Sequence, residues 1–463
     1  MPISRRDLLR AGAGAPLALF APQGGQAATP ERIAVQAPFA MPTIIVPRPD
    51  RWPAFPITRY GAVPSDRAAT RTAIARAIDA AHRAGGGRVV VPAGTWLTGG
   101  PAHLRSNVAL HLDDGAILSF SPDPADYLPG VPTSWEGIEC VNYSPLVYAL
   151  DCRNVAVTGS GVLRAELDIW QAWYARPQPH MEALVELYQM ARRGVPAAQR
   201  DMTTGAANLR PHFIQFNRCR NVLIEGVHIE NSPFWTIHPY LCRDVVIRRV
   251  SIRAHGHNND GVDPEMSQNV LIEDCVFDQG DDAVSVKSGR EFDAWRLATP
   301  SRNIVMRRCR VKNGHQLMAI GSELSGGVEN VIVDDCHFEY GEARAKTAIN
   351  NILFIKTNER RGGFVRNIHL SNVSATEIAG GVLSIDTDVL YQWRRLTPTY
   401  DRRPPPVTGI HVRDVRVARA AFLCQIKGEA ALPVRDVSMR AVRAGHLGGA
   451  AVRNRNVAGF SFK

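Results

Sequence analysis

The sequence lacks the features that define several large classes of protein. Its 463 residues contain no apolar run of about 18 residues, so no transmembrane helix is expected. No Cys-x-x-Cys pair or Cys/His cluster at zinc spacing occurs, which argues against a zinc module. The signature of leucine-rich repeats is also missing, and helical periodicity beyond about residue 105 is confined to one insertion.

Acidic charge is in deficit. Lys and Arg number 54 against 44 Asp and Glu, which leaves a formal net charge of +10. A basic surface attracts polyanions, so an acidic polysaccharide or a nucleic acid is a candidate partner, and an unspecific solvated surface is the third reading. Because basic and aromatic residues are not interleaved in stripes, we do not expect nucleic-acid binding.

The N-terminus resembles a Tat signal peptide. Arg5 and Arg6 form a twin arginine, a modest apolar stretch runs over 11–21, and small residues at 25–28 offer a cleavage site. We therefore expect a signal over residues 1–28 and a periplasmic or secreted protein. A chance double arginine before an apolar run is the alternative.

The eight cysteines recur at equivalent places in a repeated phrase. Cys152, Cys219 and Cys242 each open a Cys-Arg-Asn/Asp-Val phrase, whereas others follow apolar strands. Export would permit disulfides, but repeating positions indicate stacked, buried thiols rather than pairs.

One pattern returns from about residue 105 onward: Asn or Asp, then Val or Ile, then apolar alternation and a polar turn. Between Asn221 and Asn367 its spacing is 23 to 37 residues, within the range for solenoids. Each unit holds short β-branched runs with period-2 alternation. Residues 29–463 are therefore predicted to form one all-β domain, a single-stranded right-handed parallel β-helix.

Three segments depart from the repeat. Ala-rich residues 66–84 predict a helix that caps the open end of the solenoid, and glycines 85–87 end it. Residues 167–211 form an insertion with helical character over 181–193. The Gly- and Arg-rich tail after about residue 445 is expected to be poorly ordered or capping.

Aligned strands place several carboxylates on one sheet. Asp260 and Asp282 are 22 residues apart, about one coil, so they should stack nearly in register, with Asp281 beside them and His315 one coil further on. Stacked carboxylates repel, which raises at least one pKa and can supply the acid and base that glycoside hydrolysis needs. Asp and Asn are also common in plain turns, as at 113–114 and 334–335.

Two lysines share this sheet. Lys287 and Lys356 fall on outward positions by strand alternation and could bind an acidic sugar. Each alone would more often be a solvated surface charge. Their convergence with three acids and a histidine favours a functional site.

At these residues the chain resembles glycoside hydrolase family 28, the polygalacturonase family. The family motifs Asn-Thr-Asp, Gly-Asp-Asp, Gly-His-Gly and Arg-Ile-Lys occur here, in order, as Asn258-Asn259-Asp260, Gly280-Asp281-Asp282, Gly314-His315-Gln316 and Phe354-Ile355-Lys356. The overall pattern resembles bacterial exo-acting members more than fungal endo-acting ones.

The resemblance implies hydrolysis of α-linked galacturonate chains with inversion. It implies Asp281 as general acid, Asp260 and Asp282 as the bases that hold water, and His315 as a residue that tunes the acid or binds substrate. Further substrate-binding candidates are Asn258, Lys287, Glu323, Phe354 and Lys356. No metal or cofactor is implied. The expected partner is an acidic plant cell-wall polysaccharide or oligosaccharide. We also expect a monomer that is not bound to a membrane after the signal is removed.

The main departure is Phe354, which replaces an arginine expected to hold a sugar carboxylate. Phe354 could stack on a sugar face instead, and Arg360 and Arg361 could supply the missing charge from the following loop. Asn259 and Gln316 are milder changes. The departure opens rhamnogalacturonan or decorated pectin as the substrate.

Two other classes of function stay open. A polysaccharide lyase on the same fold would eliminate rather than hydrolyse, commonly with calcium and a basic residue. A binding protein on a β-helix would have no need of Asp260, Asp281, Asp282 and His315 together.

Overall fold

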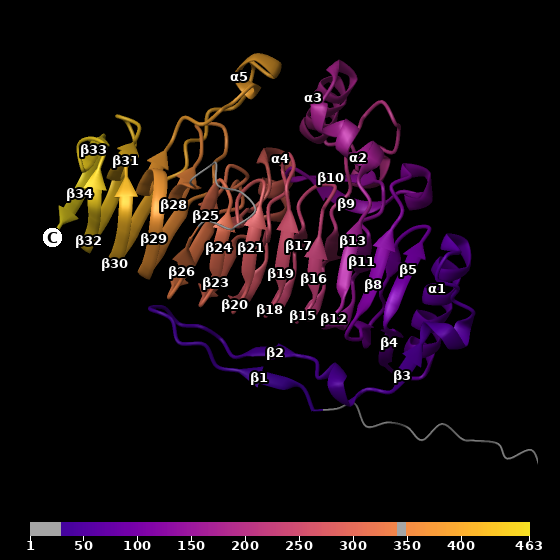
Figure 1. Cartoon of the computed structure of the whole chain (residues 1–463). Helices are drawn as coiled ribbons and strands as arrows, with labels where there is room; N and C mark the ends of the chain where they lie inside the picture. Colours follow the sequence, from indigo (N-terminus) through magenta and orange to yellow (C-terminus); the bar gives the residue numbers. More distant parts are fainter. Residues whose placement is uncertain (1–28, 340–348) are drawn as a thin grey trace, which may run out of the picture.

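The computed structural model describes residues 29–339 and 349–463, so the expected signal peptide lies outside the described residues. The described chain is a right-handed parallel β-helix, as predicted, in which strands stack in rows along the molecule (Figure 1). The first row contains β6 (Ala102–His103), β11 (Val147–Leu150), β14 (Ile214–Asn217), β17 (Ile237–Tyr240), β22 (Val284–Val286), β25 (Gln316–Ile320), β28 (Ile349–Lys356), β31 (Phe422–Lys427) and β33 (Val452–Arg455).

Two further rows complete each coil. The second row contains β3 (Ala54–Pro56), β4 (Gly87–Val91), β7 (Val108–Leu112), β12 (Arg153–Gly159), β15 (Arg220–Glu225), β18 (Arg243–Arg248), β20 (Gln268–Glu273), β23 (Ser301–Arg307), β26 (Val328–Asp334), β29 (Val365–Asp386), β30 (Val407–Ala420), β32 (Val434–Leu447) and β34 (Val457–Phe462). The long strand β29 continues into the other rows, where it pairs with β27 in the third row and with β28 and β31 in the first. The third contains β5 (Gly94–Thr98), β8 (Ala116–Phe120), β13 (Val162–Ala165), β16 (His228–Glu230), β19 (Ser251–Ala254), β21 (Val276–Gln279), β24 (Arg310–Asn313) and β27 (His337–Phe338).

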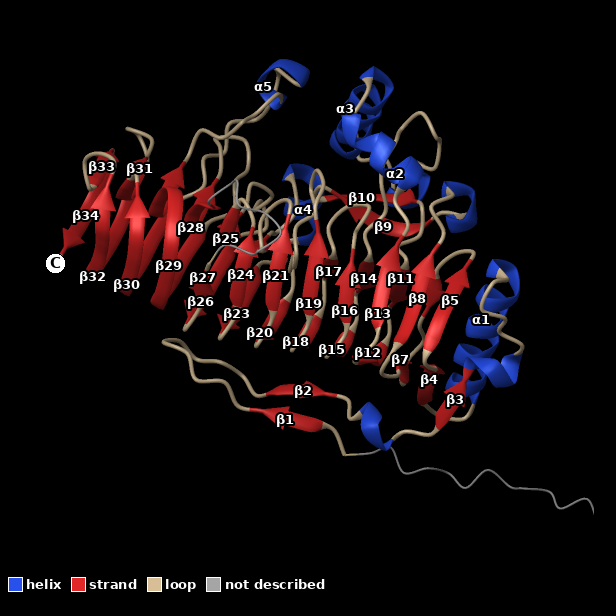
Figure 2. Cartoon of the chain, in the orientation of Figure 1, coloured by secondary structure: helices blue, strands red, loops and turns tan. Residues whose placement is uncertain are grey.

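The described helices lie outside the coils (Figure 2). They are α1 (Arg67–Arg83), α2 (Asp168–Ala172), α3 (Gln178–Arg192), α4 (Glu291–Leu297) and α5 (Trp393–Leu396). Helix α1 is the predicted cap: Asp66 accepts a hydrogen bond from the Ala69 amide at 2.9 Å, and Ile74 and Ile78 enter the core. No helix in the described part of the chain is long and apolar enough to cross a membrane.

Asparagine ladders explain the repeated Asn-Val phrase. Asn269, Asn303, Asn330 and Asn367 stand at one corner of successive coils, each with φ between 57° and 59°. Each amide nitrogen donates to the side-chain oxygen one coil earlier, at 2.7–3.0 Å. Asparagine tolerates this left-handed conformation better than most residues, so one residue type both turns the chain and fixes the register.

The thiols behave as the sequence predicts. All eight cysteines are free and buried. The Sγ atoms of Cys219, Cys242 and Cys275 donate to nearby carbonyls instead of bonding one another.

The tail is ordered, contrary to the expectation of poor order. Strands β32 and β34 pair in parallel, with Val437 opposite Phe460, and β33 pairs with β31. The tail follows the same inward alternation as the coils before it, so Val457 and Phe460 pack against the core and make the final coil.

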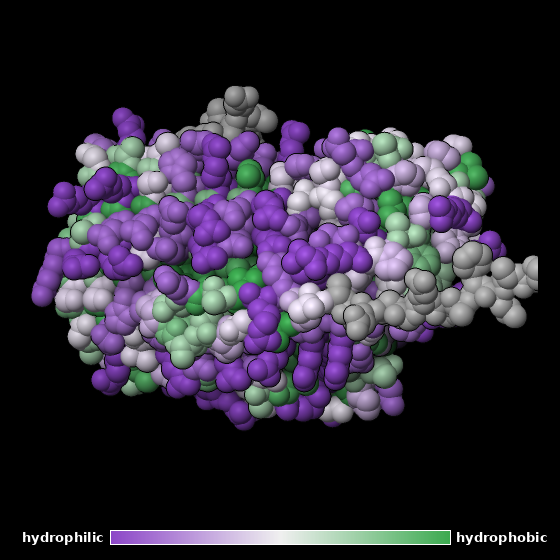
Figure 3. Space-filling view, turned by 90° about the horizontal axis from the view of Figure 1, so that it is seen from below, coloured by the Kyte–Doolittle hydropathy of each residue, from purple (hydrophilic) through white to green (hydrophobic). Residues whose placement is uncertain are grey.

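An N-terminal strap runs along the second row on its outer side, and the sequence pattern did not reveal it. Strands β1 (Glu31–Ile33) and β2 (Ile44–Val46) pair antiparallel beneath the coils (Figure 1). The strap covers an outward apolar column of Ala109, Ala156, Leu223, Val246, Leu271, Val305 and Ile332. Viewed from below, most of the remaining surface is hydrophilic, with apolar patches between charged side chains (Figure 3).

The asparagine ladder can be tested by two substitutions at Asn330, which both donates to and accepts from neighbouring asparagines. We expect Asn330→Ala to lower the free energy of unfolding by about 3 kcal/mol, because two hydrogen bonds are lost and a left-handed backbone is strained. Asn330→Gly removes the same bonds without that strain, so it should cost about 1 kcal/mol less. Denaturant unfolding measures both, and equal losses would contradict the role of the backbone conformation.

Candidate active site

The three aspartates lie together on the outer face of the first row. Val262 pairs with Val284 on the next coil, so Asp260 and Asp282, each two residues earlier, are stacked in register as predicted. The Gly261 amide donates to the Asp282 carbonyl at 3.0 Å. A Cβ on Gly261 would meet the Ala283 carbonyl at 2.5 Å, so glycine permits this close approach.

Asp281 is paired with His315 from the next coil. The His315 Nδ1 lies 3.1 Å from Asp281 Oδ1, and the Asp282 amide also donates to that oxygen at 2.9 Å. The hydrogen bond with Asp281 raises the pKa of His315 to about 9, although partial burial opposes it. Burial alone would raise the pKa of Asp281, but the bond to His315 and its charge outweigh burial and lower it to about 2.

Lys356 neutralises Asp282. Its Nζ donates to Asp282 Oδ2 at 2.9 Å, and both side chains are largely withdrawn from solvent. Burial disfavours the charged lysine, but the Asp282 carboxylate outweighs this and raises the pKa of Lys356. Asp260 differs: burial, then the Asp281 charge, raises its pKa to about 8.

The expected substrate-binding roles of Lys287 and Glu323 are not supported by their positions. Lys287 follows β22 and Glu323 lies in the turn after β25, and both are buried, with 5% and 8% of their side chains exposed. The Lys287 Nζ lies 3.6 Å from Glu323 Oε2, and Arg290 donates to Glu323 at 2.8 Å. The hairpin of β9 (Val131–Trp135) and β10 (Ile138–Asn142) packs with the insertion over the outer side of this row. The alternation of residues along a strand cannot predict burial by segments that are distant in the sequence.

Arg360 and Arg361 do not supply the charge missing at Phe354. Both are buried: Arg361 donates to Glu291 at 2.8 Å, and Arg360 donates to the Tyr188 hydroxyl at 2.6 Å. Through these bonds and those of Arg360 to the Trp393 and Thr397 carbonyls, they join α4 to α3 and to the segment that carries α5. Both guanidinium groups are therefore held by partners inside the protein.

Phe354 and Asn258 lie where the sequence places them, at the site's margins. Phe354 is half-buried in β28, in register with Ala319 and Ser384 and two residues from Lys356. Asn258 accepts a hydrogen bond from the buried Arg210 of the insertion at 3.1 Å. Phe354 thus presents a partly exposed ring on the same face as the carboxylates.

The sequence reasoning missed Tyr391 and gave no role to Glu136, although Glu136 lies in the family-like stretch Trp135-Glu136-Gly137. Tyr391 follows β29, is 62% exposed, and lies close enough to Lys356 and Asp282 to feel their charges. Glu136 accepts a hydrogen bond from Arg290 at 3.1 Å. Tyr391 lies in a turn outside any motif, so only its placement in space identifies it.

A metal ion is a poor fit to the acids beside His315. Asp281, Asp282 and His315 offer ligand atoms within 4.8 Å of one another. The Lys356 ammonium already lies on Asp282, and protonated His315 lies on Asp281, so positive charge occupies the positions that a cation would take. The arrangement suits proton transfer between carboxyl groups instead.

Comparison with known proteins relates this chain to a family of glycosyl hydrolases. Residues 199–458 match the family described as glycosyl hydrolases family 28. A probable polygalacturonase of Vitis vinifera is 26% identical over 354 residues, which is 74% of this chain and 64% of that protein. An exo-poly-alpha-D-galacturonosidase of Dickeya chrysanthemi is 27% identical over 302 residues, 60% of this chain and 49% of that protein. The chain thus spans about half to two thirds of these relatives.

A solved structure matches nearly the whole chain. The hyperthermoactive exopolygalacturonase from Thermotoga maritima is 37% identical, covers 90% of this chain and 94% of its own, and superposes with a TM-score of 0.78. The polygalacturonase from Erwinia carotovora shares the fold at 20% identity, with a TM-score of 0.61.

The Asp281–His315 pair predicts an imidazolium that persists well above neutral pH. We expect the His315 ring to remain protonated at pH 7 and to lose its proton near pH 9, as followed by NMR titration. In Asp281→Asn the stabilising charge is gone, so the midpoint should fall toward about 6.5. Asp335→Asn, at an exposed turn, is the control, and a His315 midpoint unchanged in Asp281→Asn would contradict the pairing.

Proposed function

The chain belongs to glycosyl hydrolases family 28, and from that membership we propose that it hydrolyses α-galacturonide bonds of pectic chains, from one chain end and with inversion. The observation that carries the proposal is the stack of Asp260 and Asp282 beside the Asp281–His315 pair on one outward face. Membership in a family of glycoside hydrolases argues against the lyase and the plain binding protein.

The proposed roles divide the proton chemistry among the carboxyl groups. Asp281 delivers a proton to the leaving oxygen, and Asp260 and Asp282 hold and activate the attacking water. The low pKa of Asp281 and the raised pKa of Asp260 run against this division in the substrate-free site. We retain it because Asp281 and His315 share one proton as a coupled pair, so the imidazolium can return a proton to Asp281 when a sugar displaces water.

The proposed substrate is a galacturonide-type pectic polysaccharide or oligosaccharide. The positive net charge and Lys356 on the site's face favour an acidic sugar, and the relative with 37% identity is an exopolygalacturonase. Phe354 supplies an apolar face in place of a guanidinium, which suits sugar stacking. This substitution keeps rhamnogalacturonan or decorated pectin as the second choice of substrate within the same reaction.

The proposed exo action rests on a wall at one side of the site. Helix α3 packs with the β9–β10 hairpin and Trp393 in one apolar cluster. Arg192 of the insertion donates to the Thr399 carbonyl at 3.0 Å, so the insertion and the segment around α5 are joined. Closure on one side would limit the substrate to a chain end. On the basis of the twin-arginine motif we further propose a secreted or periplasmic protein, and its monomeric state stays a prediction.

Substrates with different leaving groups can distinguish the role of the general acid from that of the base. We expect Asp281→Asn to lose about 10³-fold on galacturonate oligosaccharides, but far less on a nitrophenyl α-galacturonide, whose leaving group needs no proton. Asp260→Asn should lose activity on both substrates. Steady-state kinetics measures this, with Asp113→Asn as a control in a plain turn. Equal losses of Asp281→Asn on both substrates would reject Asp281 as the acid.

Exo action predicts a specific course of polygalacturonate digestion. Reducing ends should accumulate while viscosity hardly falls, because removal of terminal sugars leaves the chains long. Viscometry and a reducing-sugar assay on the same digest measure this, and a rapid early loss of viscosity would instead establish endo action.

A further inference from the structure

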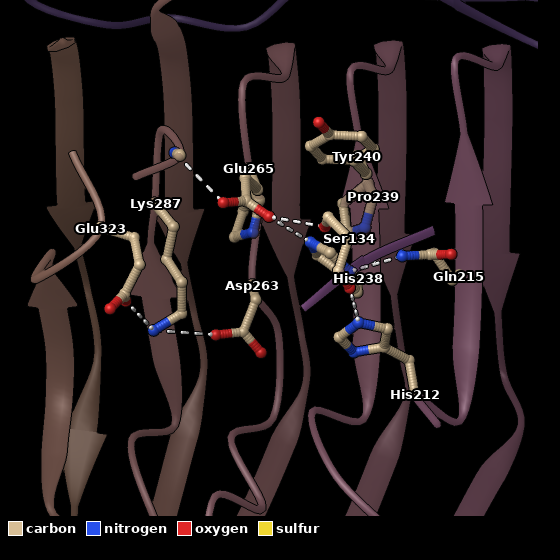
Figure 4. Close-up of polar contacts among 12 residues, drawn as sticks. Ser134, His212, Gln215, His238, Pro239, Tyr240, Asp263, Glu265, Lys287 and Glu323 are labelled. Carbon is tan, nitrogen blue, oxygen red and sulfur yellow. Dashed lines mark hydrogen bonds and ion pairs between the residues drawn. The ribbon is translucent and has the colours of Figure 1, made fainter. Parts of the chain in front are cut away.

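Lys287 lies at the centre of a buried group of carboxylates. Its Nζ is 3.7 Å from Asp260 Oδ2, 3.5 Å from Asp263 Oδ1 and 3.6 Å from Glu323 Oε2. The Ser285 hydroxyl accepts from it at 3.0 Å, and the Trp235 ring lies 4.4 Å away. Figure 4 shows the ammonium between Asp263 and Glu323, so it faces protein carboxylates.

Asp263 has no partner that satisfies a carboxylate. Its side chain is fully buried, and neither of its oxygens accepts a hydrogen bond from the described residues. An ionised carboxylate without hydrogen bonds is very costly inside a protein, and such a group normally takes up a proton. The Asp263 and Asp260 carboxyls are close enough to share a hydrogen bond when one of them is protonated.

The balance of charge points the same way. Asp260, Asp263, Glu323 and Glu136 lie around Lys287 and Arg290. Arg361 also acts on Glu323, and Lys356 is bonded to Asp282. Arg290 bonds both glutamates, at 3.1 and 2.8 Å. Lys287 is then the remaining cation for two aspartates, and it cannot neutralise both.

We propose that Asp263 and Lys287 are positioning residues for Asp260: Asp263 carries a proton, and Lys287 is thereby left to balance the charge of the Asp260 carboxylate. The inference rests on the proposed function, in which Asp260 holds the attacking water as an ionised base. Burial, and then the Asp281 charge, raises the pKa of Asp260 to about 8, and the Lys287 ammonium opposes that rise, so Asp260 ionises at a lower pH with Lys287 than without it.

Other charged groups around the pair are accounted for. Asp260 also faces Asp281, Asp282 and Lys356, and Lys287 also faces Asp282. On the far side, Glu265 accepts a hydrogen bond from Ser134 at 3.2 Å and lies 2.9 Å from the His238 Nε2 (Figure 4). Burial, and then the Lys287 charge, holds the pKa of His238 well below its usual value, so His238 adds no positive charge to the balance.

The test compares the acid limbs of kcat/KM against pH on a galacturonate trisaccharide, since this limb reports the ionisation of the base in the free enzyme. In Lys287→Met the cation is gone, so the limb should move to higher pH by at least about one unit, which is a tenfold loss at low pH. In Asp263→Asn a neutral amide replaces a neutral carboxyl, so the limb should shift by less than about half a unit.

Two outcomes would overturn the inference. A Lys287→Met enzyme whose limb stays in place would show that Lys287 has a structural role alone, even if its thermal stability falls. A limb that moves down by about one unit or more in Asp263→Asn would show that Asp263 is ionised. If Lys287→Met does not fold, Ser285→Ala, which removes the hydroxyl at 3.0 Å, should move the limb in the same direction by less.

The wild-type enzyme separates this inference from the proposed function. No hydrolysis of any pectic oligosaccharide by the wild type would reject the function itself. Hydrolysis by the wild type with unmoved limbs in the Lys287 and Ser285 variants would reject the positioning roles and leave the function standing.

Discussion

The structure depends on the register between consecutive coils. Parallel strands about 4.8 Å apart repeat every side chain directly above its equivalent, so a one-residue slip would turn inward residues outward. The asparagine corners fix that register through side-chain bonds of 2.7–3.0 Å. The same register that stacks Val262 on Val284 in the core stacks Asp260 on Asp282 outside it. The candidate catalytic constellation therefore follows from the geometry of the scaffold, without a special loop.

In-register stacking also creates the electrostatic problem of the site, because like charges on neighbouring coils repel. Each carboxylate lies near a cationic side chain from another position along the row. His315 lies on Asp281, Lys356 on Asp282, and Lys287 between Asp260 and Asp263. Protonation of a carboxyl is the remaining way to lower the repulsion, and the most buried group is where it costs least.

Sequence patterns predicted the coils, the cap and the stacked acids because each depends on periodicity along the chain. Burial was predicted poorly wherever it depends on a segment distant in sequence. Lys287 is outward by alternation, yet the hairpin and the insertion cover it, and Arg361 is withdrawn by its bond to Glu291. No periodic pattern in the sequence predicts that the strap covers Leu271 or that Tyr391 lies near Lys356 and Asp282. The tail after 445 was misjudged by its composition, although its alternation matches a coil.

The segments proposed to close one side of the site and the surroundings of Asp260 share the same packed residues. Trp235, over which Lys287 lies, packs with Trp135 of the hairpin and Leu184 of the insertion in one apolar cluster. The segments that close one side of the site therefore also remove water from the Asp260 neighbourhood, and water removal raises the pKa of a carboxyl unless a cation is buried with it. Under the proposed roles, a chain that had these segments without Lys287 would lose the ionised form of Asp260. The proposed exo action and the proposed base therefore depend on the same buried cluster.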